Sequence, residues 1–204
     1  MTDVVGLVLC GGAGRRMGGA DKGLIQVDGL SNAERAVRLL NPLCGRCFVS
    51  ANRNLEFYAS IEGVEVISDL RSDYQGPLAG LEALAPILLE VKSDARLILL
   101  PCDLPKLSHE VPKRLLAELG QREDMDIIYA STPHGGHYLC AALRISVLAK
   151  VSQRLDGSDY SVRGWYASCK SASLSFGTEF SEGFLNLNRV DDLDRQDQII
   201  GNKV

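Results

Sequence analysis

A glycine-rich segment near the N-terminus carries several fixed positive charges. Residues 11–23 read GGAGRRMGGADKG and include Arg15, Arg16 and Lys22. Glycines let backbone N–H groups approach phosphate oxygens without a Cβ in the way. Arginine binds phosphate with a planar fork, and lysine supplies a compact charge. The segment therefore predicts a loop that cradles a triphosphate; the alternative is a mobile surface turn with solvated charges.

Two common nucleotide-binding loops do not match this segment. The dinucleotide fingerprint G-x-G-x-x-G fails because Met17 stands where its third glycine is required. The Walker A loop needs a lysine preceded by glycine and followed by serine or threonine, whereas Lys22 lies between Asp21 and Gly23. The segment therefore indicates another kind of nucleotide loop.

The composition is typical of a soluble globular protein. The chain has 204 residues, of which 46% are hydrophobic and 24% charged. This length predicts a single domain, residues 1–204, that buries a core without disulfides or a structural metal. The net charge of −4 argues against a nucleic-acid partner, so the local cations favour a small anionic ligand. With no membrane-spanning apolar run and no basic leader, we expect a cytoplasmic protein without a membrane partner, and we predict a monomer.

Six cysteines are scattered along the chain, and Cys44 and Cys47 have C-x-x-C spacing. A redox or zinc pair is one interpretation of that spacing. A redox pair normally opens a helix after a strand, whereas residues 48–52 (FVSAN) favour a strand. We therefore interpret both cysteines as reduced small residues in a helix-to-strand connection.

Apolar runs alternate with amphipathic segments along most of the chain. Ser31 and Glu34 have the spacing of a capping box, so a helix is expected to begin near Asn32. Several strands are apolar on both faces, which is typical of a parallel sheet covered by helices. The predicted strands are Val4–Cys10, Phe48–Ala51, Val64–Ile67, Leu97–Cys102, Asp126–Ser131 and Tyr138–Leu143, with Phe184–Leu187 also extended. The other predicted helices are Leu78–Val91, Glu110–Leu119, Val147–Leu155, Val162–Cys169 and Val190–Ile200.

Polar residues follow the first four predicted strands at the points where these strands end. The glycine loop follows the first strand, Asn52 and Arg53 the second, Asp69 the third and Asp103 the fourth. In an open parallel sheet, ligands bind beyond the carboxyl ends of the strands. We therefore expect all four groups to meet at one edge. A turn cap remains the alternative for Asp103, and bonds to neighbouring backbone N–H groups the alternative for Asp69.

The segment Leu9–Gly23 resembles the signature loop of the MobA-like nucleotidyltransferases. Four further motifs resemble the molybdenum cofactor guanylyltransferase branch: residues 50–53 (SANR), 73–80 (DYQGPLAG), 101–105 (PCDLP) and 186–188 (NLN). The similarity spans residues 5–192. It implies an α/β fold, namely a Rossmann-like three-layer sandwich with a mostly parallel central sheet, of the nucleotide-diphospho-sugar transferase type.

The resemblance also implies roles for individual residues. Arg16, Lys22 and Asp103 would be catalytic, and Asp103 would hold Mg²⁺. Two departures from the branch are Cys10, where alanine is usual, and Ser50, where asparagine is frequent, so Asn52 is the safer contact to the base. The residues that would bind GTP or the pterin are Leu9, Cys10, Gly11, Gly12, Lys22, Ser50, Asn52, Asp69, Gly76, Gly80, Asp103, His137, Asn186 and Asn188.

The implied reaction is attack by the phosphate of molybdenum-molybdopterin on the α-phosphorus of GTP. Pyrophosphate leaves and molybdopterin guanine dinucleotide forms. Since the substrate supplies the nucleophile, the protein only aligns the reactants and neutralises charge. GTP and molybdopterin are the implied partners, and other proteins of molybdenum cofactor biosynthesis stay open as partners. The alternatives are a related cytidylyl- or sugar-nucleotidyltransferase and a catalytically silent nucleotide-binding regulator.

The residues assigned to the pterin also have simpler interpretations. His137 follows a Gly-Gly pair, so a hairpin turn with a solvated histidine is the alternative to a pterin contact. Asn186 and Asn188 share a face if the segment is extended, and they could equally be residues of an edge strand.

Overall fold

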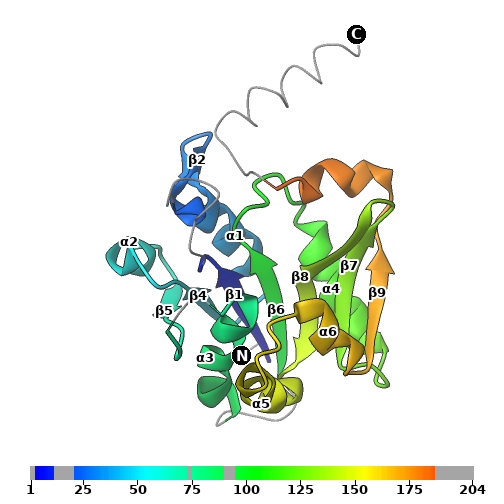
Figure 1. The fold of residues 1–204 in the computed structure, drawn as a ribbon. Helices are drawn as coiled ribbons and strands as arrows, with labels where there is room; N and C mark the ends of the chain where they lie inside the picture. Colours follow the sequence, from blue (N-terminus) through cyan, green and yellow to red (C-terminus); the bar gives the residue numbers. More distant parts are fainter. Residues whose placement is uncertain (1–2, 12–20, 73–74, 90–94, 187–204) are drawn as a thin grey trace.

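The computed structural model describes residues 3–11, 21–72, 75–89 and 95–186 (Figure 1). Within these residues, seven strands form one sheet in the order β5-β4-β1-β6-β8-β7-β9. The strands β5, β4, β1 and β6 are parallel, β8 runs antiparallel to both β6 and β7, and β7 is parallel to β9. Their bounds are β1 Val4–Leu9, β4 Arg46–Ser50, β5 Val64–Ile67, β6 Arg96–Pro101, β7 Ile127–Thr132, β8 Gly135–Arg144 and β9 Ser171–Ser175.

Helices cover both faces of this sheet, and a two-stranded ribbon of β2 (Gln26–Val27) and β3 (Leu30–Ser31) lies beside it. None of the helices in the described ranges is long and apolar enough to cross a membrane. The α-helices are α1 Asn32–Leu40, α2 Leu55–Ala59, α3 Pro77–Leu89, α4 Glu110–Gln121, α5 Val151–Asp156 and α6 Val162–Ala167. The 3₁₀ helices are η2 Lys22–Leu24, η3 Ile145–Lys150 and η4 Thr178–Phe184.

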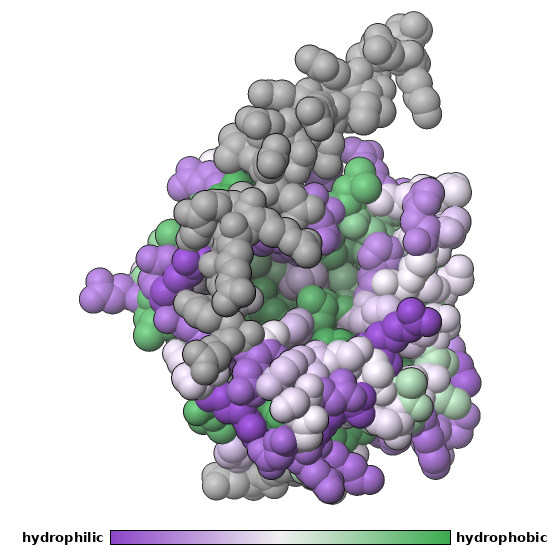
Figure 2. All heavy atoms as spheres, viewed as in Figure 1, coloured by the Kyte–Doolittle hydropathy of each residue, from purple (hydrophilic) through white to green (hydrophobic). Residues whose placement is uncertain are grey.

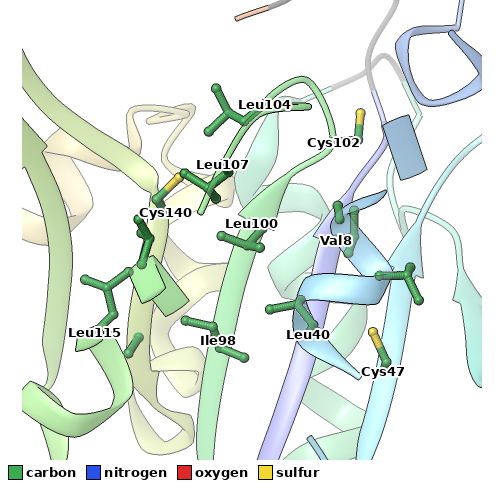
Figure 3. Close-up of a cluster of buried hydrophobic side chains, with 14 of the residues drawn as sticks. Val8, Leu40, Cys47, Ile98, Leu100, Cys102, Leu104, Leu107, Leu115 and Cys140 are labelled. Carbon is green, nitrogen blue, oxygen red and sulfur yellow. The ribbon is translucent and has the colours of Figure 1, made fainter. Parts of the chain in front are cut away.

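The core consists of two hydrophobic layers, one on each face of the sheet. Successive side chains of a strand point to opposite faces, so Val8 of β1 joins one layer and Leu7 the other. Val8 packs in the layer of Leu40 from α1 and Leu115 from α4 (Figure 3). Leu7 belongs to the layer that includes Leu81 from α3. The predicted three-layer α/β fold with a mostly parallel sheet is therefore confirmed.

The predicted start of the first helix is also confirmed. The Ser31 hydroxyl accepts a hydrogen bond from the Glu34 backbone N–H at 3.2 Å, and the Glu34 carboxylate accepts one from the Ser31 backbone N–H at 2.8 Å. This reciprocal capping box satisfies two donors that a helix start would otherwise leave unpaired. Helix α1 then begins at Asn32.

The C-terminal third differs most from the sequence prediction. Phe184 was expected in an extended segment, but it ends the 3₁₀ helix η4. Strand β9 was not predicted because its sequence, SASLS, is polar and lies half-exposed at the edge of the sheet. The predicted helix Val147–Leu155 is divided into η3 and α5. Leu187 and the predicted helix Val190–Ile200 lie outside the described residues.

Cys44 lies in the connection from α1 into β4, as predicted, whereas Cys47 lies within β4. Both are free thiols, and burial raises the pKa of each to about 12. A Cβ added at Gly6 of β1 would lie 3.0 Å from the Cys44 sulfur and 3.3 Å from the Cys47 sulfur. The two thiols therefore fill the space over this glycine, and their neutral form at physiological pH suits packing rather than redox chemistry.

Candidate nucleotide site

The carboxyl ends of the four parallel strands lie in register. Leu9 at the end of β1 pairs with Ser50 of β4 on one side and with Pro101 of β6 on the other. Ser50 in turn pairs with Ile67, the last residue of β5. The residues that follow these strands therefore emerge at a single edge of the sheet, as the sequence predicts. In Figure 2 the surface is hollowed near its centre, and hydrophobic residues are visible on the floor of the hollow.

Two residues predicted to be catalytic meet at this edge. Lys22 belongs to the 3₁₀ helix η2, and Asp103 follows β6. The Lys22 ammonium donates a hydrogen bond to Asp103 Oδ2 at 2.8 Å, and the side chains are 32% and 15% exposed. The two residues are 81 positions apart in the sequence, and only the fold brings them together. A cation and a carboxylate thus share one partly buried position, where water screens their charges less than at an open surface.

A second pair of side chains lies at the same edge, where β4 and β5 end. The Asn52 side chain donates to Asp69 Oδ2 at 2.7 Å and accepts from the Asp69 backbone N–H at 2.9 Å. Burial raises the pKa of Asp69, the hydrogen bond from Asn52 opposes this rise, and the charge of Glu82 adds to it. A Cβ on Gly11 would lie 3.7 Å from the Asn52 amide nitrogen. Gly11, Asn52 and Asp69 are therefore neighbours, as expected for one part of a nucleotide site.

Glycine occupies two positions near the site for different structural reasons. Gly76 has a φ of +77°, a conformation that favours glycine, and nothing lies within 4 Å of the position its Cβ would take. Gly80 is buried in α3, and its Cβ would lie 2.6 Å from the Ser50 hydroxyl and 2.9 Å from a methyl carbon of Leu9. Gly80 therefore lets α3 pack directly on β1 and β4.

The side chains of three predicted contacts point into the protein rather than to its surface. Leu9, Cys10 and Ser50 are all buried. Burial raises the pKa of the Cys10 thiol, and the neighbouring Cys102 raises it further. The Cys10 backbone N–H donates a hydrogen bond to the Ser50 carbonyl at 2.9 Å. Any role of these residues in nucleotide binding would therefore rest on the shape that they give to the edge.

The predicted acceptor residues lie on the antiparallel side of the sheet. Since β8 is antiparallel to β6, its first residues lie toward the edge where β6 ends. Here His137 Nε2 is 3.1 Å from Thr132 Oγ1, and the His137 ring stacks on Phe184 with 4.2 Å between centroids. Burial lowers the pKa of His137, and the nearby His134 lowers it further. Asn186, two residues beyond Phe184, is exposed.

Several residues of the site were not recognised in the sequence. Thr132 and Phe184 hold His137, and the sequence gives no sign of this because neither lies next to it in the chain. Asp21 and Tyr58 form a hydrogen bond of 2.7 Å beside Lys22. For Asp21 a signal was available, because a carboxylate directly precedes the lysine of the loop.

Three predicted site residues belong to segments beyond the described residues. Gly12 and Arg16 in the glycine loop and Asn188 near the C-terminus lie outside the described residues. The part of the chain that the structure describes holds no group of three or more histidine, cysteine, aspartate or glutamate side chains suited to a metal ion. A single carboxylate such as Asp103 still fits Mg²⁺, which takes most of its ligands from water and substrate phosphates.

Comparisons with known proteins identify the family of the chain. Residues 6–172 match the MobA-like NTP transferase domain family. The chain is 36% identical over 179 residues to the molybdenum cofactor guanylyltransferase of Bordetella petrii, covering 86% of this chain and 88% of that protein.

Solved structures share the fold. The molybdopterin-guanine dinucleotide biosynthesis protein A of Archaeoglobus fulgidus superposes with a TM-score of 0.73 at 20% identity, covering 97% of this chain and 98% of that one. A Mycobacterium tuberculosis protein in complex with manganese superposes with a TM-score of 0.67 at 18% identity, covering 95% and 97%. At these identities, the structural likeness establishes the fold alone.

Proposed function

Because the chain belongs to the MobA-like NTP transferase family, we propose that it transfers GMP from GTP to the phosphate of molybdenum-molybdopterin. Pyrophosphate is released and molybdopterin guanine dinucleotide is formed. The chain is thus a nucleotidyltransferase of molybdenum cofactor biosynthesis. We also propose that residues 1–204 act as one domain. The observation that carries this proposal is the Lys22–Asp103 pair at the carboxyl edge of the parallel strands.

The pair suits the phosphate end of the nucleotide. Lys22 supplies a compact positive charge for the triphosphate, and Arg16 of the same loop would bind phosphate with its guanidinium. Family membership supports the use of a divalent cation, and we propose that Asp103 holds Mg²⁺. When bound, the ion would neutralise charge on the phosphate oxygens. With an ion at its carboxylate, Asp103 would compensate the Lys22 charge less, which favours contact of the ammonium with phosphate.

The neighbouring pair suits the nucleoside end. Asn52 and Asp69 carry amide and carboxylate groups next to Gly11, where donors and acceptors of a guanine or ribose could pair with them. Gly76 leaves open space at the start of α3. Leu9, Cys10, Ser50 and Gly80 would shape this edge from below through their packing.

The acceptor would lie on the side of β8. His137 presents a ring fixed by Phe184 and Thr132, and Asn186 and Asn188 offer amide groups that match the edge of a pterin. The incoming phosphate is the nucleophile, so the residues of the chain need only align it with the α-phosphorus of GTP. Burial raises the pKa of the Cys140 thiol of β8, and the nearby charge of Asp103 raises it further, which supports a position of Asp103 between the two sides.

A thermal-shift panel tests the choice of nucleotide. A ligand that binds only the folded protein raises its apparent stability by mass action. With Mg²⁺ present, GTP should raise the melting temperature clearly more than CTP or UTP at equal concentration. A larger shift with CTP would instead favour a cytidylyltransferase, and no shift with any of the three would oppose nucleotide binding.

A further inference from the structure

The turn that carries Lys22 is held by a buried carboxylate. The Asp21 side chain is only 6% exposed. Its Oδ1 accepts hydrogen bonds from the Gly23 backbone N–H at 3.1 Å and from the Tyr58 hydroxyl at 2.7 Å. Its Oδ2 accepts one from the Asn54 amide at 2.8 Å and lies 3.9 Å from Arg53 Nε. A carboxylate this deeply buried is stable only with such partners.

These partners join two separate parts of the site. Gly23 belongs to η2 together with Lys22, whereas Arg53 and Asn54 follow β4 and Tyr58 belongs to α2. Asp21 therefore ties the lysine turn to the segment that directly follows Asn52. The residues expected at the phosphate end and those expected at the nucleoside end are thus fixed relative to each other through one side chain.

Two unusual residues fit this arrangement. A Cβ on Gly23 would lie 2.2 Å from the Tyr58 hydroxyl, so only glycine lets Tyr58 reach Asp21. Asn54 has a φ of +52°, in the left-handed region, and it stands at the N-cap of α2 without capping it. Its side-chain amide binds Asp21 instead. Asparagine tolerates this backbone conformation better than most residues.

The hydrogen bonds of Asp21 also indicate how this residue would act. Both of its oxygens already accept from protein donors, which leaves it poorly suited to hold a metal ion or to meet phosphates directly. Its neighbour Lys22 reaches Asp103, and the Lys22 carbonyl accepts a hydrogen bond from Asn32 at 3.0 Å. Asp21 therefore fixes the backbone from which the lysine extends.

We propose that Asp21 is a positioning residue that locks the Lys22 turn onto the β4–α2 connection and so sets the affinity for the triphosphate and the rate of transfer. The inference rests on the proposed function, because it assumes that Lys22 binds the phosphates of GTP. Small misplacements of a binding group are costly, since a shift of about 1 Å can slow a reaction about 100-fold.

A double-mutant cycle tests the proposal. In Asp21→Asn the amide keeps one acceptor for Tyr58 but turns a donor toward Asn54 and Arg53. This variant should weaken binding of a fluorescent GTP analogue with Mg²⁺ about 10-fold and reduce kcat, with the KM for molybdopterin unchanged. In a Lys22→Ala background the same change should cost less than about 2-fold, because coupled residues are not additive. Asp28→Asn, which alters an exposed carboxylate paired with Arg35, is the matched control and should behave as wild type.

The possible outcomes test the role of Asp21 separately from the proposed transfer of GMP. If Asp21→Asn weakens nucleotide binding by the same factor with and without Lys22, or not at all, Asp21 does not act through the lysine. If Asp21→Asn fails to fold, Tyr58→Phe removes one donor of the same network and should show the same coupling more weakly. Wild-type protein that binds GTP without transferring GMP would contradict the proposed function, while the binding cycle would still decide the role of Asp21.

Discussion

The side proposed for the nucleotide and the side proposed for the acceptor are built on different principles. On the nucleotide side, the strand ends of β5, β4, β1 and β6 are parallel and in register, so the residues after them meet at one edge. On the acceptor side, β8 and β7 form an antiparallel hairpin, and η4 contributes Phe184 from far along the chain. The strand ends indicate where Asn52, Asp69 and Asp103 lie on the nucleotide side, whereas the contacts of His137 on the acceptor side depend on packing with a distant segment.

The two sides also differ in chemistry. The nucleotide side contains the ion pair of Lys22 with Asp103 and the buried carboxylate of Asp21. The acceptor side contains the stacked rings of His137 and Phe184, with 4.2 Å between centroids. The Lys22 cation suits a polyanion, and flat rings suit a planar heterocycle. The predictions below test this division.

The largest effect is expected from Asp103→Asn. The substitution removes the carboxylate that pairs with Lys22 and that we propose holds Mg²⁺. Turnover should fall about 100-fold or more, since a lost charge in a preorganised site is costly. Steady-state rates at limiting Mg²⁺ measure this effect. Asp124→Asn, which changes an exposed carboxylate, is the control. Turnover like that of the wild type would remove Asp103 from the mechanism.

Gly80→Ala should act on stability, because the new Cβ would meet Ser50 and Leu9 at under 3 Å. We expect a loss of about 1–3 kcal/mol in the free energy of unfolding, measured by chemical denaturation. In the control Gly120→Ala, the Cβ meets only the end of the Arg96 side chain, at 3.1 Å, so stability should be retained. Full stability of Gly80→Ala combined with lost GTP binding would show that Gly80 clears space for the ligand instead.

A smaller and more selective effect is expected on the acceptor side. Asn186→Ala combined with Asn188→Ala should raise the KM for molybdopterin about 10-fold, the loss expected for one or two hydrogen bonds. The dissociation constant for GTP should stay unchanged. Asn41→Ala changes an exposed asparagine elsewhere and serves as the control. Loss of GTP binding as well would mean that the two sides share contacts, and an unchanged KM would exclude these asparagines.

The smallest effect is a pH dependence of GTP binding that arises from Asp69. Burial raises its pKa, so its carboxylate takes up a proton at a higher pH than an ordinary aspartate. If the ionised form contacts the nucleoside, affinity is complete above this raised pKa and falls as the pH drops through it. The ionised form is disfavoured by folding, so Asp69→Asn should not lower stability at neutral pH. Titration calorimetry across mildly acidic pH should show that the affinity for GTP depends on pH in the wild type but not in this variant. The same pH dependence in both proteins would contradict the assignment.

The contrast between the two sides also explains what the sequence could predict. The Leu9, Ser50 and Pro101 strand ends follow apolar runs, so the positions of Asn52, Asp69 and Asp103 could be inferred before the fold was known. The fold class followed from the same alternation of strands and helices.

Other features depended on contacts that no local pattern encodes. The stacking of His137 on Phe184 joins residues 47 positions apart in the numbering, and the polar strand β9 forms because it pairs with β7 at the sheet edge. The hydrogen bonds of Asp21 include one from Tyr58 of α2. This helix has five residues, which is too short for a clear periodic pattern.

Transfer of the α-phosphate tests the central claim most directly. Wild-type protein is incubated with Mg²⁺, molybdenum-loaded molybdopterin and GTP labelled at either its α- or its γ-phosphate. The account predicts that the α-label enters the pterin dinucleotide, that the γ-label leaves in pyrophosphate, and that CTP gives far less product. Absence of α-label from the pterin product, or equal transfer from CTP, would contradict it.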